Sequence, residues 1–217
     1  LLSSVDRCAS MLAAQGLAEG DCLLIAMPTT PQGVIAFYAA NRLGARPAMI
    51  HPLSTPAEIT HYLDATGATM VLTLDAYYPS VAAATPRRAL ARIILARIAD
   101  YLPPLKGLGF WLTKGRHIGA IPADARVRHW ADRMRVAAPL AEPPRRAPHD
   151  VAAILFSGGT TGLPKGIELT NANFIAQGTQ AVAWVHISEA DSMLAILPIF
   201  HGFGLAVCVN AVLLAGG

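Results

Sequence analysis

The first 77 residues alternate between segments of helical period and short apolar runs, and this alternation limits the folds open to the chain. Helical patterns are predicted at 5–16, 31–45 and 57–67, and apolar strands at 22–27, 46–50 and 69–74. Parallel strands are buried on both faces and need a crossover between them, so apolar runs that alternate with helices are typical of them. The pattern predicts an α/β fold with a mostly parallel sheet flanked by helices.

The third of these helices has the clearest start signal. Thr55 supplies an N-cap hydroxyl, Pro56 suits the first helical position, and Glu58 stands where a capping box needs an acidic side chain. These three residues predict that the helix begins at Pro56.

Charge is distributed unevenly along the chain. Of the 217 residues 53% are hydrophobic and 14% charged, so the core is ample and disorder is a poor explanation of the whole chain. Residues 87–146, however, hold 13 of the 17 Lys and Arg and 4 of the 14 Asp and Glu. Within this segment, 87–102 is predicted to form a basic amphipathic helix.

We expect one incomplete domain, lacking its C-terminal side. Its first α/β portion covers 1–80, a basic, aromatic-containing insert and linker covers 81–150, and a phosphate-binding loop with an acyl-pocket portion covers 151–217. The linker "AEPPRRAPHD" leads into a further predicted strand, "VAAILF".

The basic segment 87–146 has two interpretations. With Phe110, Trp111 and Trp130 it could contact a membrane surface, with aromatics at the interface and cations on the headgroups. The preferred interpretation is a solvated face whose aromatics pack on the domain. Nucleic-acid binding is not expected, because no known binding motif accompanies the charge.

Cysteine usage and the apolar tail bear on location. Cys8, Cys22 and Cys208 fit neither a disulfide framework nor a zinc site, which favours a reducing, cytoplasmic compartment, with the inner membrane face as a peripheral option.

The stretch 192–217 carries no formal charge, but Pro198, His201 and several glycines interrupt it. We predict a buried strand, a loop and a core helix there rather than a membrane span.

A glycine-rich loop follows the strand predicted at 151–156. Backbone N–H groups in such a loop can converge on phosphate oxygens, because glycine permits close approach. Ser157, Thr160 and Thr161 add hydroxyl donors, and Lys165 adds a positive charge. The expected order of strand, loop and helix would place these groups at the carboxyl edge of the sheet, where open α/β sheets bind ligands.

Known phosphate motifs do not match this loop. A P-loop needs Gly-Lys followed by Ser or Thr, whereas Lys165 lies between Pro164 and Gly166. The dinucleotide pattern also fails, since "GFGLAV" has valine where the third glycine belongs. A glycine turn without a ligand remains the plain alternative.

The stretch "FSGGTTGLPKGIELTNANF" resembles the signature loop of the AMP-forming adenylating (AMP-binding) enzymes, with Gly158 in place of a common serine. That superfamily includes acyl-CoA synthetases, luciferases and peptide-synthetase adenylation domains. "LPIFHGFGL" at 197–205 and the stretch 37–72 are similar to further family segments. The stretch "DYLPPLKGLGFWLTKG" is most similar to bacterial long-chain fatty acid–CoA ligases, and the chain is identified as an N-terminal fragment of such an enzyme.

The resemblance implies an acid–thiol ligase that joins a carboxylic acid, expected to be a long-chain fatty acid, to AMP. Pyrophosphate leaves, and the acyl group then passes to coenzyme A. Lys165 and His201 are the implied catalytic residues, and Thr160 the implied Mg²⁺ ligand. His201, Gly202 and Phe203 would line the acyl and carboxylate pocket. The implied ATP phosphate-binding residues are Ser157, Gly158, Gly159, Thr160, Thr161, Gly162 and Lys165.

Family motifs for adenine, ribose and the C-terminal catalytic lysine are absent from the sequence, so the 217 residues are expected to be inactive alone. Two alternatives stay open. A fatty-acyl-AMP ligase or peptide-synthetase adenylation domain would use the same first step with another thiol acceptor. A non-catalytic membrane-surface or nucleotide-binding remnant would carry out neither the adenylation step nor the transfer to a thiol. Acyl-chain length and oligomeric state are not specified by the sequence.

Overall fold

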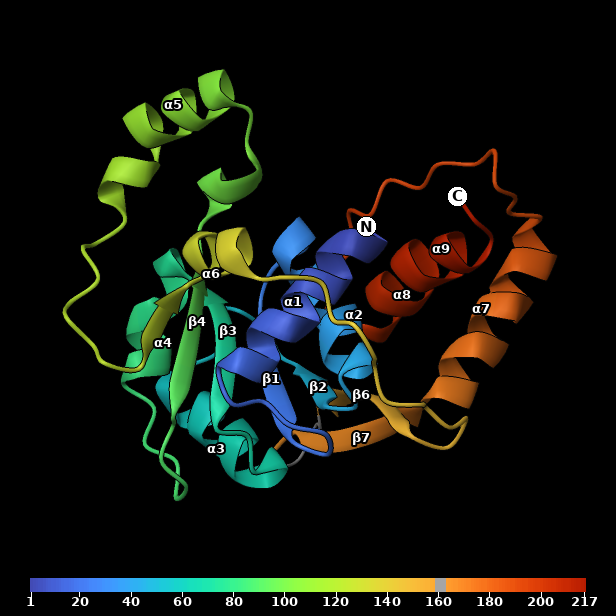
Figure 1. Cartoon of the computed structure of the whole chain (residues 1–217), viewed down its shortest axis with the longest axis horizontal. Helices are drawn as coiled ribbons and strands as arrows, with labels where there is room; N and C mark the ends of the chain where they lie inside the picture. Colours follow the sequence, from blue (N-terminus) through green and yellow to red (C-terminus); the bar gives the residue numbers. More distant parts are fainter. Residues whose placement is uncertain (159–162) are drawn as a thin grey trace.

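A computed structural model describes residues 1–158 and 163–217 of the chain. It contains a seven-stranded sheet in the order β5-β4-β3-β1-β2-β6-β7 (Figure 1). Every neighbouring pair is parallel except β6 and β7, which are antiparallel. The strands are β1 Cys22–Ala26, β2 Arg46–Met49, β3 Met70–Leu74, β4 Arg92–Ala96, β5 Val127–His129, β6 Val151–Ser157 and β7 Lys165–Thr170.

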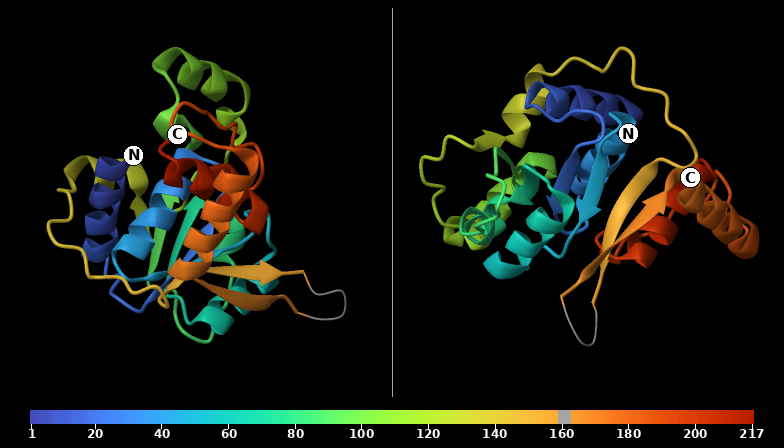
Figure 2. Two further views of the ribbon diagram at one scale, coloured as in Figure 1. Left: turned by 90° about the vertical axis from the view of Figure 1, so that its right-hand side faces the viewer. Right: turned by 90° about the horizontal axis from the view of Figure 1, so that it is seen from below.

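Helices cover both faces of this sheet, as Figures 1 and 2 show. The predicted α/β fold is therefore confirmed, and so are the three strands and three helices expected before residue 77. The helices are α1 Leu2–Ala14, α2 Pro31–Arg42, α3 Pro56–Thr66, α4 Tyr78–Ala82, α5 Pro104–Thr113, α6 Trp130–Val136, α7 Asn171–Val185, α8 Gly202–Leu205 and α9 Val212–Leu214, with a π-helical turn at Ala206–Ala211 joining the last two.

Apolar side chains alternate between the two faces of the sheet. In β1, Leu23 and Ile25 pack with α1 and α2, whereas Leu24 packs with α3 on the opposite face. All three side chains are fully buried. A strand covered on both faces needs apolar residues at every position, which explains the unbroken run "CLLIA".

Helix α3 begins as its sequence predicts. The Glu58 N–H donates to the Thr55 hydroxyl at 3.3 Å, and the Thr55 N–H donates to the Glu58 carboxylate at 2.7 Å. Gly67 ends the helix with φ of +67°, a left-handed conformation that favours glycine. The predicted capping box is confirmed.

The prediction of a helix over 87–102 is wrong. The centre of this segment forms β4, in which Ile93 and Ile94 are fully buried and pair with β3, and a 3₁₀ turn follows at Ile98–Tyr101. The short apolar run "RIILA" fits a strand as well as a helix turn, and pairing with the edge of β3 decides between them. The segment 81–150 thus contributes β4 and β5 to the main sheet.

Two contacts fix the chain around β5. Trp130, the first residue of α6, is 1% exposed and packs in the same cluster as α1, as expected of an aromatic that packs on the domain. Just before β5, the Tyr78 hydroxyl donates to Asp124 at 2.8 Å, and Arg126 donates to the same carboxylate at 2.8 Å. The hydrogen bonds from Arg126 hold the pKa of Asp124 well below its usual range.

The apolar tail forms the predicted loop and core helix but not the predicted strand. Leu205 and Val209 on the α8–α9 segment are buried, whereas residues 192–197 have no regular structure. Leu194 and Ile196 are exposed, and a strand forms only where a neighbouring strand can pair with it. Within 1–158 and 163–217, no helix combines the length and the apolar character needed to cross a membrane.

Candidate active site

The glycine-rich loop joins two antiparallel strands. β6 ends at Ser157 and β7 begins at Lys165, and these two residues pair across the hairpin. Figure 2 shows β6 and β7 projecting beyond the rest of the sheet. The expected order of strand, loop and helix is therefore wrong, because β7 comes between the loop and α7. The loop still follows the carboxyl end of a parallel strand, as predicted.

Ser157 and Lys165 bring a hydroxyl and a cation together at the last strand pair before the loop. Residues directly opposite each other in an antiparallel pair present their side chains to the same face of the sheet. Lys165 is exposed, Ser157 is half-buried and Gly158 is exposed. The other predicted phosphate-binding residues, 159–162, lie outside the described residues, and so does the predicted Mg²⁺ ligand Thr160.

Helix α3 supports the base of this loop. Nε2 of His61 lies 2.9 Å from the carbonyl oxygen of Pro164, so a protonated Nε2 donates a hydrogen bond to the loop. The neighbouring Tyr62 packs its ring on Phe156 of β6, with centroids 4.4 Å apart. Spacing along the sequence contains no signal for His61, because the contact joins segments that are remote in the chain.

Gly166 explains why glycine follows the lysine. A Cβ at this position would lie 3.2 Å from Ile154 Cγ2 and 3.3 Å from the Phe156 ring. Both neighbours belong to β6, so the absence of a side chain lets β7 pack closely against that strand. The Pro-Lys-Gly sequence thus has a structural role in the hairpin.

The second predicted motif, 197–205, lies across the carboxyl ends of β1 and β2. The Thr29 hydroxyl donates to the Leu197 carbonyl at 2.9 Å, and the Phe200 ring contacts His51, with ring centroids 4.6 Å apart. Ile199 is fully buried against Gly33, where a Cβ would lie only 2.6 Å from Ile199 Cδ1. The motif is therefore anchored on the same edge of the sheet that carries the loop.

His201 caps the helix that follows. Its Nδ1 accepts a hydrogen bond from the Phe203 N–H at 3.3 Å, so in the neutral ring the proton is on Nε2. His201 and Phe203 are exposed, and a Cβ at Gly202 would approach Leu155 of β6 at 3.5 Å. Leu155 is two residues before Ser157, so the 197–205 motif approaches β6 close to the residue at which the glycine-rich loop begins.

Gly204 makes the turn before this helix possible. A Cβ at this position would lie 2.2 Å from the Pro198 carbonyl oxygen and 2.7 Å from its carbonyl carbon. The backbone of residue 198 therefore packs directly on the first helical turn, and this close approach fixes the N-terminal position of His201. Sequence reasoning assigned no role to Gly204, although glycine at this point of "HGFGL" was a visible signal.

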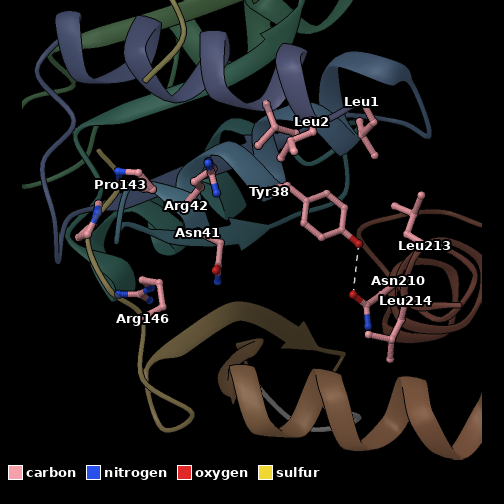
Figure 3. Close-up of a pocket in the computed structure, with 12 residues that line it drawn as sticks. Leu1, Leu2, Tyr38, Asn41, Arg42, Pro143, Arg146, Asn210, Leu213 and Leu214 are labelled. Carbon is pink, nitrogen blue, oxygen red and sulfur yellow. Dashed lines mark hydrogen bonds between the residues drawn. The ribbon is translucent and has the colours of Figure 1, made fainter. Parts of the chain in front are cut away.

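A separate cleft of about 550 Å³ lies between α1, α2 and the end of the chain (Figure 3). The Tyr38 hydroxyl donates to the Asn210 side chain at 3.2 Å across it, and burial raises the pKa of Tyr38. Its described lining residues include neither Lys165 nor His201. The cleft is therefore distinct from the predicted site.

The described residues offer few grouped donors for a metal ion. Among residues 1–158 and 163–217, no cluster of three or more His, Cys, Asp or Glu side chains could hold a metal ion. Mg²⁺ is commonly bound through one or two carboxylates together with substrate phosphates.

Comparison with known proteins defines the class. The AMP-binding enzyme family matches residues 1–217. The chain belongs to the AMP-binding enzyme family, and the resemblance seen in its sequence motifs is confirmed.

Two of its relatives are acid–CoA ligases. The chain is 30% identical over 215 residues to a long-chain-fatty-acid–CoA ligase of Bacillus subtilis, with 97% of this chain and 38% of the relative covered. It is 32% identical over 232 residues to 4-coumarate–CoA ligase 1 of Oryza sativa subsp. japonica, with 99% and 36% covered. The chain thus spans little more than a third of the length of these relatives.

A solved structure shows the same fold. An anthranilate–CoA ligase in complex with anthranoyl-AMP superposes with a TM-score of 0.81 at 19% identity, over 99% of this chain and 38% of that one. At this level of identity the likeness establishes the shared fold. The α/β architecture described above is therefore shared with part of that anthranilate–CoA ligase.

Proposed function

We propose that this chain forms the part of an ATP-dependent acid–CoA ligase that binds the ATP phosphates and the carboxylate of the acid substrate. The observation that supports the proposal is the approach of Gly202, next to His201, to Leu155 of β6, two residues before the Ser157–Lys165 pair at the base of the loop. Membership in the AMP-binding enzyme family and similarity to acid–CoA ligases support the same activity.

The reaction begins when a carboxylate oxygen of the acid attacks the α-phosphorus of ATP. The bond to the bridging oxygen breaks, and its electron pair leaves with pyrophosphate. Lys165 and the N–H groups of the loop stabilise the negative charge that develops on the departing group. In the second step the thiol of coenzyme A loses its proton to solvent and its sulfur attacks the acyl carbon, and the carbon–oxygen bond to AMP breaks so that AMP leaves with that electron pair.

His201 orients the carboxylate. Since its Nδ1 accepts the Phe203 N–H, the proton on Nε2 is free to be donated to a substrate oxygen. Gly202 and Phe203 line the same approach, and exposure of the Phe203 ring provides apolar surface for the acid. We propose a long-chain fatty acid as that substrate, a choice supported by the similarity to the Bacillus subtilis ligase.

Mg²⁺ is proposed to bind together with the ATP phosphates. The chemistry it supplies when bound is neutralisation of phosphate charge. Thr160 is its proposed hydroxyl ligand, and the phosphates of ATP would provide anionic oxygens.

The substitution Lys165→Ala tests the proposal in the intact gene product that contains these 217 residues. We expect pyrophosphate release with saturating fatty acid and ATP to fall by about 100-fold, the usual effect of losing one donor to a developing anion. Arg88→Ala, which removes an exposed cation of another segment, is the matched control. Unchanged release in Lys165→Ala would contradict the role of the loop, and absence of release with every carboxylic acid would contradict the ligase itself.

A further inference from the structure

Helix α5 has an unusual surface for an element of a packed domain. None of its ten residues is buried, and Figure 1 shows it standing away from the sheet. Its exposed apolar side chains are Leu105 at 82%, Leu108 at 55%, Trp111 at 58% and Leu112 at 50% of their full surface. Four large apolar side chains exposed on a ten-residue helix form an apolar patch of the kind that marks an interaction site.

These side chains lie on one side of the helix. Leu105, Leu108 and Leu112 follow the spacing of three and four residues that places side chains on one face, and Trp111 is adjacent to them. Phe110 points elsewhere, since it is half-buried and lies close to Gly115 in the following turn. The helix therefore presents aliphatic groups and one indole outward while Phe110 holds it to its own turn.

The surrounding charge is of one sign. From Tyr101 to Ala123 the sequence contains no Asp or Glu, while Lys106, Lys114 and Arg116 are all exposed. Lys106 lies on the side of the helix away from this face, and Lys114 and Arg116 follow the end of the helix. Long cationic side chains around an apolar helix complement a surface that offers negative headgroups over hydrocarbon. The indole of Trp111 suits the boundary between these two layers.

The exposed apolar side chains of α7 lack this charge pattern. Ile175, Trp184 and Val185 are 56%, 86% and 58% exposed, and at 3.6 residues per turn Ile175 and Trp184 lie on opposite sides of the helix. No Lys or Arg occurs between residues 166 and 217, and Glu189 and Asp191 follow the helix. These side chains therefore have no neighbouring cations in the sequence to attract anionic headgroups, and they serve as an internal comparison.

We propose that α5, with the turn Gly115–His117, is a docking element for an anionic lipid bilayer. The contact is peripheral, with the apolar face at the depth of the headgroups and the three cations on lipid phosphates. Within the basic segment, Trp130 takes no part, because it is buried in the core. The inference is independent of the proposed ligase activity.

Vesicle flotation of the intact gene product tests this inference. We expect binding to vesicles of phosphatidylglycerol and phosphatidylcholine, and little binding to phosphatidylcholine alone. Replacing Lys106, Lys114 and Arg116 by Gln should weaken binding on the order of 100-fold, given that each cation near such a surface contributes about 1 kcal/mol. Replacing Leu105, Leu108 and Trp111 by Ser should abolish binding while leaving the net charge unchanged.

The matched control replaces Ile175, Trp184 and Val185 by Ser, and it should bind as the unmodified protein does. Brominated lipids add a local readout, because quenching of tryptophan emission should disappear in Trp111→Phe and persist in Trp184→Phe. Equal binding of the α5 variants and the control would overturn the proposal, as would failure to float with either vesicle. Sedimentation that shows a dimer lost only in the α5 serine variant would instead assign the surface to a second copy.

Discussion

Gly204 provides the sharpest test of how the His201 turn is built. Ordinary contacts of a Cβ begin near 3.4 Å, but at this position it would meet the Pro198 oxygen at 2.2 Å and the Leu197 oxygen at 2.8 Å. In Gly204→Ala the backbone of these residues must therefore move by roughly 1 Å in a close-packed region. Over-packing of side chains usually costs about 1–3 kcal/mol, and we expect at least the upper value because backbone is displaced here.

Gly202→Ala is the matched control, two residues earlier in the same helix. Its Cβ would meet only Leu155 Cδ1, at 3.5 Å, which is an ordinary contact. Alanine is favoured over glycine within helices by about 1 kcal/mol, so this variant should be as stable as the unmodified protein or slightly more stable.

Urea denaturation followed by circular dichroism measures both free energies of unfolding. Hydrogen exchange of the Leu205 N–H, which donates to His201 at 3.1 Å, reports locally on the turn. We expect faster exchange at this amide in Gly204→Ala only. If the two alanine variants unfold at the same urea concentration and protect this amide equally, the close approach does not constrain the turn.

Two further predictions concern stability. In Asp124→Asn we expect a loss of about 1–2 kcal/mol at neutral pH, since hydrogen bonds from Tyr78 and Arg126 to a charged group are removed. The folded pKa of Asp124 lies below its unfolded value, so this stabilisation is present above roughly pH 4 and is lost as the pH falls through the folded pKa. Urea denaturation at a series of acidic pH values should therefore show the free energies of unfolding of Asp124→Asn and the unmodified protein converging. A difference that stays constant with pH would contradict the assignment. Thr55→Ala should cost about 1 kcal/mol through loss of the cap on α3, measured by thermal unfolding against Thr55→Ser, which should retain most of the stability; equal destabilisation by both would show that the hydroxyl is not the cause.

Local signals in the sequence were sufficient where short-range physics decides the structure. Thr55 and Glu58 specify a helix start through hydrogen bonds between residues three apart, and unbroken apolar runs specify strands buried on both faces. The segment 87–102 was mispredicted because a five-residue apolar run fits both periods until β3 offers it an edge. Only tertiary pairing resolves that ambiguity.

The site was predictable in its motifs but not in its supports. The period-two pattern of "KGIELT" indicated a strand, yet the expected order of strand, loop and helix passed over it, and the hairpin was missed. The contact of His61 with Pro164 and the packing of Ile199 on Gly33 join remote segments. Such contacts depend on the completed sheet, which no local pattern encodes.

The position of β6 beside β2 has a consequence for the order of folding. Strands β1 to β5 can assemble from residues 22–129, whereas Ala48 must wait for Ile154 to pair with it. Pairing residues this far apart carries a larger loop-closure entropy than pairing β1 with β2, so we expect the hairpin to join the sheet late. Until it does, β2 would have an open edge, and Pro47, which has no N–H to offer, would make that edge a poor template for mispairing. We therefore expect the last strand to join the parallel sheet to be the one that carries the loop.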